Sequence, residues 1–162
     1  MSAWERVLET LAEEFADLED PARATRVVLR LFLAALLGGL LGFEREQHGK
    51  AAGVRTHMLV ALGAALFVLV PQMAGAEHDA MSRVIQGLTA GIGFLCAGTI
   101  LKRDRMDEVK GLTTAAGLWS TTAIGVTVGL GYEATALLAA LVVLAILNLL
   151  PHLLGRFDRP RR

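Results

Sequence analysis

The chain has 162 residues, which is enough for one compact domain, and equal numbers of basic and acidic residues give it a formal net charge of zero. Hydrophobic residues make up 54% and the mean hydropathy is +0.50, but soluble domains reach similar apolar fractions, so the class depends on where these residues lie. The single cysteine, Cys96, excludes an intramolecular disulfide framework. We expect it to be a small apolar residue at a helix contact rather than a redox or metal-binding group.

Residues 1–22 are predicted to form an acidic amphipathic helix. Its apolar residues recur at helical spacing, and no apolar core of the kind found in signal peptides is present. Pro21 is expected to separate this helix from the next one. We expect the helix to lie on the membrane surface or to pack on the bundle, with docking of a partner as the alternative. The apolar residues are Trp4, Val7, Leu8, Leu11, Phe15 and Leu18.

Five transmembrane helices are predicted within residues 23–155. Four segments, at 58–76, 84–101, 111–132 and 134–155, contain no Asp, Glu, Lys or Arg, and the segment 27–43 is interrupted only by Arg30. A span needs about 20 mostly apolar residues to cross roughly 30 Å of hydrocarbon. Helices of soluble proteins keep a polar face, which several of these segments lack. The predicted fold is therefore an all-α membrane bundle with spans at about 27–43, 57–76, 84–101, 112–131 and 134–155.

The charges of the connections indicate one orientation in the membrane. Basic residues concentrate in the connections 44–56 and 102–110 and in a tail at 156–162, while the other connections carry almost none. The positive-inside rule places these basic segments in the cytoplasm. With five spans, the acidic N-terminal segment is then expected outside and the C-terminus inside.

Two unusual side chains fall inside predicted spans. Arg30, near the start of the first span, can extend its guanidinium to the outer interface or pair with a buried partner, for which Glu133 is the candidate on the same side. Trp119 falls near the middle of the fourth span and not at a membrane interface. We expect Trp119 to pack inside the bundle, with its indole N–H hydrogen-bonded.

Small residues follow helix-contact spacing in three spans. In lipid, such residues allow two helix backbones to approach closely. We expect these rows to serve packing within the bundle, with a homo-oligomer contact as the alternative, because spacing does not distinguish an internal from an external surface. The rows are Ala34, Gly38 and Gly42 in the first span, Gly87, Gly91 and Gly98 in the third, and Gly117, Thr121, Gly125 and Gly129 in the fourth.

Charged and hydroxyl residues gather where the two predicted cytoplasmic connections meet the helix ends. Gly53 and Gly111 come just before helix starts and indicate tight turns, and a threonine can cap the fourth helix. An Arg–carboxylate pair across the first connection would hold its two helices together, with ordinary anchoring at the membrane interface as the alternative. The predicted polar cluster consists of Glu44, Arg45, Arg55, Thr56, Thr113 and Thr114.

The sequence lacks the motifs of common catalytic and metal sites. It contains no HExxH, CxxC, Walker or GxSxG pattern, and its histidines are scattered. We therefore expect no enzyme, no bound cofactor and no nucleic-acid partner. Mg²⁺ is usually held by carboxylate oxygens, and the second to fifth spans contain none, so Glu44 is the single candidate ligand near a span.

Five sequence blocks occur in colinear order between about Arg30 and Tyr132. They are Arg30-Leu-Phe-Leu-Ala34, Gly38 with Gly42-Phe-Glu-Arg-Glu46, Gly53-Val-Arg-Thr-His-Met-Leu-Val60, Gly91-Ile-Gly-Phe-Leu95 with Ala97-Gly98, and Gly111-Leu-Thr-Thr-Ala-Ala116 with Trp119. Together these blocks resemble the MgtC/SapB family of bacterial and archaeal membrane proteins. The resemblance assigns motif or packing roles to Gly38, Gly42, Gly53, Gly91, Gly93, Gly98, Gly111 and Trp119.

The sequence departs from the family pattern at two places. Cys96 stands where the family usually has glycine, which is expected to adjust helix packing there. Many members carry a soluble C-terminal domain after the last span, whereas this sequence ends at Arg162, so a short member is expected.

The resemblance implies a protein of the cytoplasmic membrane linked to magnesium limitation, acid stress and, in pathogens, survival inside host cells. Members were named as magnesium transporters, but the family picture favours a regulator of P-type magnesium pumps or of the proton-driven ATP synthase. The shortage of intramembrane carboxylates also favours a regulatory or interaction protein. An ion transporter or channel built from an oligomer is the alternative, and an intramembrane enzyme is the least favoured possibility.

Overall fold

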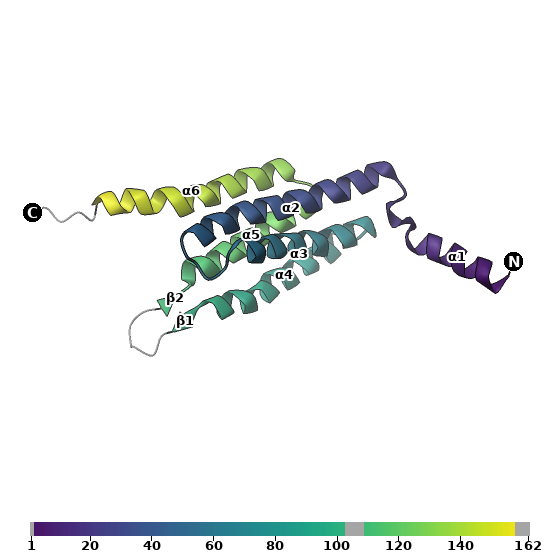
Figure 1. The fold of residues 1–162 in the computed structure, drawn as a ribbon, viewed down its shortest axis with the longest axis horizontal. Coiled ribbons are helices and arrows are strands. Elements are labelled where there is room, and N and C mark those ends of the chain that lie inside the picture. The colour runs from purple at the N-terminus through teal and green to yellow at the C-terminus, as the bar shows by residue number, and fades with distance from the viewer. Residues whose placement is uncertain (1, 103–108, 158–162) are drawn as a thin grey trace, which may run out of the picture.

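A computed structural model describes the backbone of residues 2–102 and 109–157, and the side chains of residues 2–100 and 110–149. The chain is almost entirely helical (Figure 1). A two-residue strand, β1 (Leu101–Lys102), pairs antiparallel with β2 (Val109–Lys110). The helices are α1 (Ala3–Glu14), the 3-10 helix η1 (Ala16–Leu18), α2 (Pro21–Gln47), α3 (Val54–Met73), α4 (His78–Thr99), α5 (Leu112–Leu130) and α6 (Glu133–Phe157).

Three of the described helices, α2, α3 and α4, are long and apolar enough to cross a membrane by their length and composition. The described apolar stretch of α6, Glu133–Leu149, is shorter. Helix α5 is not among these three, and many of its residues are buried in the bundle. The all-α membrane fold is therefore confirmed, while two of the five predicted spans do not meet this criterion within the described residues.

Helix α2 starts earlier than the predicted span because its N-terminus is capped. The Asp20 carboxylate accepts hydrogen bonds from the backbone N–H groups of Ala22 (3.2 Å) and Arg23 (3.1 Å). Pro21 occupies the first helical position, where its missing N–H costs nothing. The proline predicted to separate two helices therefore also begins the second of them.

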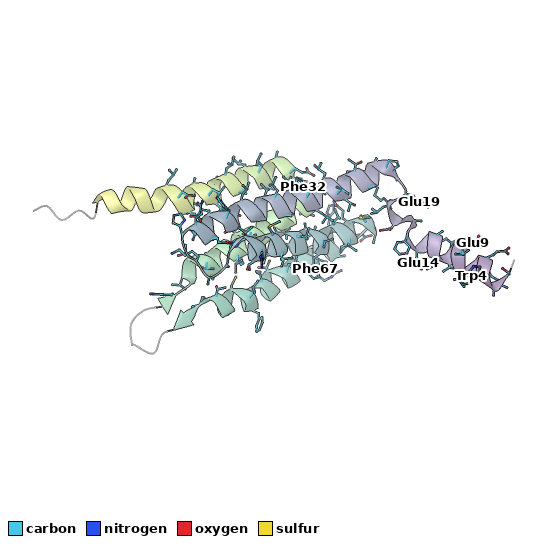
Figure 2. All side chains as sticks on the ribbon, viewed as in Figure 1. Trp4, Glu9, Glu14, Glu19, Phe32 and Phe67 are labelled. Atoms are coloured by element: carbon cyan, nitrogen blue, oxygen red, sulfur yellow. The ribbon has the colours of Figure 1, made fainter. Side chains whose placement is uncertain are left out.

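Helix α1 projects away from the bundle (Figure 1). Ser2 and Glu5 form a capping box at its start, and none of its residues is buried. Its apolar face is exposed, with Trp4 at 69% and Phe15, just after the helix, at 80% (Figure 2 labels Trp4). Of the expected alternatives, packing on the bundle is not what the structure has, because no residue of α1 is buried and its main neighbour is η1. Its apolar face is available to a membrane surface or a partner.

Helices α2, α3 and α5 form the close-packed centre of the protein. A Cβ added to Gly38 of α2 would lie 2.9 Å from the Ala61 Cβ of α3, and one added to Gly42 would lie 2.6 Å from the Val54 Cα. One turn further along α3, a Cβ on Gly129 of α5 would lie 3.0 Å from the Ala65 Cα. Glycine is therefore required where these backbones touch, and two of the three predicted small-residue rows are internal packing surfaces. Helix α6 packs on α2 and α5 through Ala136 and Ala140.

Helix α4 lies at the edge of the bundle, where it packs mainly on α5 (Figure 1). Met81 is its one buried residue. An added Cβ on Gly87, Gly91, Gly93 or Gly98 would meet nothing within 4 Å. The third predicted small-residue row therefore faces out of the bundle, so the expectation of internal packing is wrong for this row.

Candidate functional site

Glu44 and Arg45, in the last turns of α2, form a buried ion pair. The side chains of Glu44 and Arg45 are 6% and 4% exposed, and the guanidinium contacts both carboxylate oxygens, with Arg45 Nη2 donating to Glu44 Oε1 at 2.8 Å. His48 Nδ1 lies 3.1 Å from the same Oε1. The predicted Arg–carboxylate pair thus forms between neighbouring residues of one helix and not across the connection.

Glu46 joins the two helices instead. Its Oε2 accepts a hydrogen bond from the backbone N–H of Val54 at 2.9 Å, so a carboxylate on α2 caps the N-terminus of α3. Gly53 allows this approach, because an added Cβ would collide with the Glu46 carboxylate. Glu46 lies in one of the family blocks, but no role was predicted for it. The sequence signal for this cap was an acidic residue at the end of one helix, separated from the start of the next helix by a short connection.

His57, in the first turn of α3, is fully buried at 0% exposure. Its Nδ1 lies 3.0 Å from the Gly53 carbonyl, which therefore accepts a hydrogen bond from Nδ1–H. Its Nε2 points toward Gly117 of α5 and has no hydrogen-bond partner among the described residues. His57 lies in one of the motif blocks but is not a member of the predicted cluster.

The remaining residues of the predicted cluster differ in how exposed they are to solvent. Thr114 is buried at 3% and lies one helical turn before Gly117, which faces His57, so the starts of α3 and α5 adjoin. Arg55 and Thr113 are exposed, and Thr56 is half-buried. Glu44, Arg45, His57 and Thr114 are therefore each buried, whereas Arg55 and Thr113 lie on the surface.

Arg30 has partners at the opposite end of the bundle. Its Nη1 donates to Gln72 Oε1 of α3 at 2.8 Å and to the Gly129 carbonyl of α5 at 3.0 Å. Its Nε lies 3.4 Å from Glu133 Oε1 of α6. Of the two alternatives for Arg30, the structure has the pairing with Glu133, and it adds a second partner, Gln72, that was not predicted.

Trp119 does not pack inside the bundle as expected. It is 53% exposed, because α5 turns its neighbours Leu118 and Thr122 inward and leaves residue 119 on the outer face. Cys96 lies at the contact of α4 with α5, where its Sγ is 3.2 Å from the Ala115 carbonyl oxygen.

An apolar groove of about 570 Å³ runs between α3 and α4. One wall comes from Leu59, Gly63 and Phe67 of α3, and the other from α4 residues that include Gly87 and Gly91 (Phe67 is labelled in Figure 2). The groove combines large apolar side chains with glycines that leave room for a backbone to approach. Within the part of the chain that the structure describes, no three His, Cys, Asp or Glu side chains are grouped so that they could hold a metal ion.

A model of the MgtC family matches residues 31–156. Similar proteins include SrpB of Synechococcus elongatus, 47% identical over 63% of this chain and 62% of SrpB. The Escherichia coli K12 protein named "Putative magnesium transporter YhiD" is 38% identical over 80% of this chain and 62% of its own length. MgtC of Salmonella typhimurium LT2 is 43% identical over 72% of this chain and 49% of its own length. The chain thus spans only 49% to 62% of these relatives, and no solved structure matches.

Proposed function

Because the chain belongs to the MgtC family, we propose that it is a magnesium-linked membrane protein that regulates another membrane protein and does not itself carry ions. The observation that carries this proposal is a contrast between two parts of the molecule. Its described buried Glu44–Arg45 pair is satisfied within the chain, whereas the apolar groove between α3 and α4 is open. The proposal includes no catalytic activity and no resident cofactor.

The buried group at the end of α2 supports a structural role. Among the described side chains, Glu44 is the one buried carboxylate, and Arg45 occupies both of its oxygens. Mg²⁺ binds through carboxylate oxygens and keeps several waters, so this carboxylate would have to leave Arg45 to act as a ligand. Next to this pair, α2, α3 and α5 touch backbone to backbone at glycines, which favours a rigid core.

The α3–α4 groove supports an interaction role. Its occupant in this proposal is a transmembrane helix of the regulated protein, which by family resemblance would be a P-type magnesium pump or the ATP synthase. An apolar helix would fill the groove, and Gly87 and Gly91 would let its backbone come close. In this proposal five helices, α2 to α6, cross the cytoplasmic membrane of the cell, with the N-terminus outside and the C-terminus inside.

Magnesium transport is the competing function, and the name of the Escherichia coli relative favours it. Measuring Mg²⁺ flux into liposomes that contain only this protein distinguishes transport from regulation. We expect no flux above that of empty liposomes from protein whose helical content and melting transition show it to be folded. Flux that disappears in Glu44→Ala would instead establish transport and place Glu44 on the path.

Co-reconstitution tests the regulatory role directly. The activity of a P-type magnesium pump or of ATP synthase is measured with and without this protein, and again with Gly91→Leu, which fills the groove. Ala123→Leu is the matched control, because it enlarges an exposed position of α5 outside the groove. We expect a change in activity that is lost with Gly91→Leu and kept with Ala123→Leu. Equal behaviour of both variants, or no effect of the wild-type protein on either enzyme, would contradict the proposal.

A further inference from the structure

A second cavity, of about 330 Å³, lies between the start of α2 and the end of α3, far from the buried Glu44–Arg45 pair. This is the end of the bundle at which α1 joins it (Figure 1). Three arginines of one α2 face line the cavity, and α3 contributes an amide and two apolar side chains. These residues are Arg23, Arg26, Arg30, Gln72, Leu69 and Met73.

Arg30 lines this cavity and is held in a fixed position. Its hydrogen bonds to Gln72 and to the Gly129 carbonyl hold the guanidinium in place, and Glu133 balances its charge from the far side. Glu133 does not line the cavity. Arg30 therefore offers an oriented cation whose position does not depend on a ligand.

Arg23 and Arg26 supply the unbalanced charge. The Nε of Arg26 donates to the Ala22 carbonyl at 3.2 Å, and both side chains belong to exposed residues. Neither has an ion-pair partner within the described parts of the chain. The nearest acid in sequence, Asp20, already accepts the backbone N–H groups of residues 22 and 23. Two of the three arginines that line the cavity, Arg23 and Arg26, therefore have no ion-pair partner among the described residues.

We propose that this cavity binds a phosphate group, with an anionic phospholipid headgroup as its source. Guanidinium groups form paired, parallel hydrogen bonds to phosphate oxygens, and arginine is preferred over lysine for this geometry. The cavity lies at the end of an apolar helix long enough to span a membrane, which is the depth of a lipid headgroup. Leu69 and Met73 give it an apolar wall suited to the glycerol and first methylenes of a lipid. This site is independent of the groove and of the regulatory role proposed above.

The test is native mass spectrometry of the full chain in detergent, titrated separately with phosphatidylglycerol, phosphatidylcholine and inorganic phosphate. We expect phosphatidylglycerol to bind more tightly than phosphatidylcholine. The double variant Arg23→Gln/Arg26→Gln should weaken phosphatidylglycerol binding roughly tenfold or more, since each arginine near the headgroups contributes to anionic-lipid binding. Both residues are exposed, so the melting temperature should stay close to that of the wild type.

Arg83→Gln is the matched control, because Arg83 is an exposed arginine in the second turn of α4 and does not line this cavity. It should bind phosphatidylglycerol like the wild type. Tight binding of inorganic phosphate that the double variant loses would support the phosphate site but identify a free anion as its source. Equal loss in Arg83→Gln, or unchanged lipid binding in the double variant, would overturn the proposal.

Discussion

Gly125 of α5 lies directly against the backbone of Ala61 in α3, where an added Cβ would stand 2.9 Å from the Ala61 Cα. One helical turn further along, Gly129 meets Ala65 in the same way, so the two helices run in the same direction with their backbones in contact. Such a contact leaves no room for a side chain on α5. A methyl group added at Gly125 or Gly129 would therefore have to push α5 away from α3.

Gly125→Ala is expected to lower the free energy of unfolding by about 1–3 kcal/mol, because the new methyl group forces α3 and α5 apart. Gly91→Ala is the matched variant, since an added Cβ at Gly91 meets nothing within 4 Å. Alanine is preferred over glycine inside a helix by roughly 0.5–1 kcal/mol, so Gly91→Ala should be neutral or slightly stabilising. Thermal unfolding of both variants in detergent checks this, and similar losses in the two would contradict the assigned packing.

Substitution of Arg30 is expected to lower the free energy of unfolding mainly because the hydrogen bonds to Gln72 and Gly129 are lost. Loss of the contact with Glu133 should contribute less. Arg30→Met should lower the free energy of unfolding by about 2–4 kcal/mol, because it leaves a side-chain amide and a backbone carbonyl without their charged donor. Glu133→Gln should cost less than about 1 kcal/mol, since that carboxylate is 38% exposed and its contact is 3.4 Å long. A double-mutant cycle measures the pair, and a coupling as large as the whole Arg30→Met loss would show that Glu133 is the main partner.

The cap that Glu46 places on α3 can be tested with two substitutions. Glu46→Ala should lower the free energy of unfolding by about 0.5–2 kcal/mol, because the backbone N–H of Val54 loses its acceptor. Glu46→Gln keeps an oxygen acceptor and loses only the charge near the helix N-terminus, which contributes about 0.3–1 kcal/mol. Chemical unfolding ranks the variants, and faster amide exchange at Val54 should accompany the larger loss. No difference between alanine and wild type would show that the cap is dispensable.

Substitution of Gly111 is expected to be destabilising both because of its backbone conformation and because of a close contact. Comparison with Gly49, which has the conformation without the contact, distinguishes the two causes. Its φ is +96°, and an added Cβ would collide with the Thr99 carbonyl oxygen. Gly49 also has a positive φ, of +63°, but an added Cβ there would meet nothing within 4 Å. Gly49→Ala should therefore cost only the backbone strain, about 1–2 kcal/mol, and Gly111→Ala should cost more. Melting temperatures provide the comparison, and equal costs would mean that the contact with Thr99 relaxes freely.

The helices themselves were largely predictable, because each apolar segment is bounded by charged or glycine-containing connections. The early start of α2 was missed because the cap by Asp20 depends on a side-chain conformation and not on the apolar pattern. The Arg–carboxylate pair expected across the first connection was wrong, because Arg45 pairs with Glu44 of its own helix. The turn adopted here aims Glu46 at the start of α3 and leaves Arg55 outside.

The sequence alone determined that this is an all-α membrane protein of the MgtC family, because hydrocarbon requires long apolar helices and the motif blocks follow them in order. The rotation of each helix about its axis was decided only by the tertiary structure. That rotation buries the glycines of α2 and α5, exposes those of α4 and turns Trp119 outward. In lipid an apolar residue is stable on either side of a helix, so apolar spacing cannot specify the face, and close backbone packing with buried polar pairs must select it.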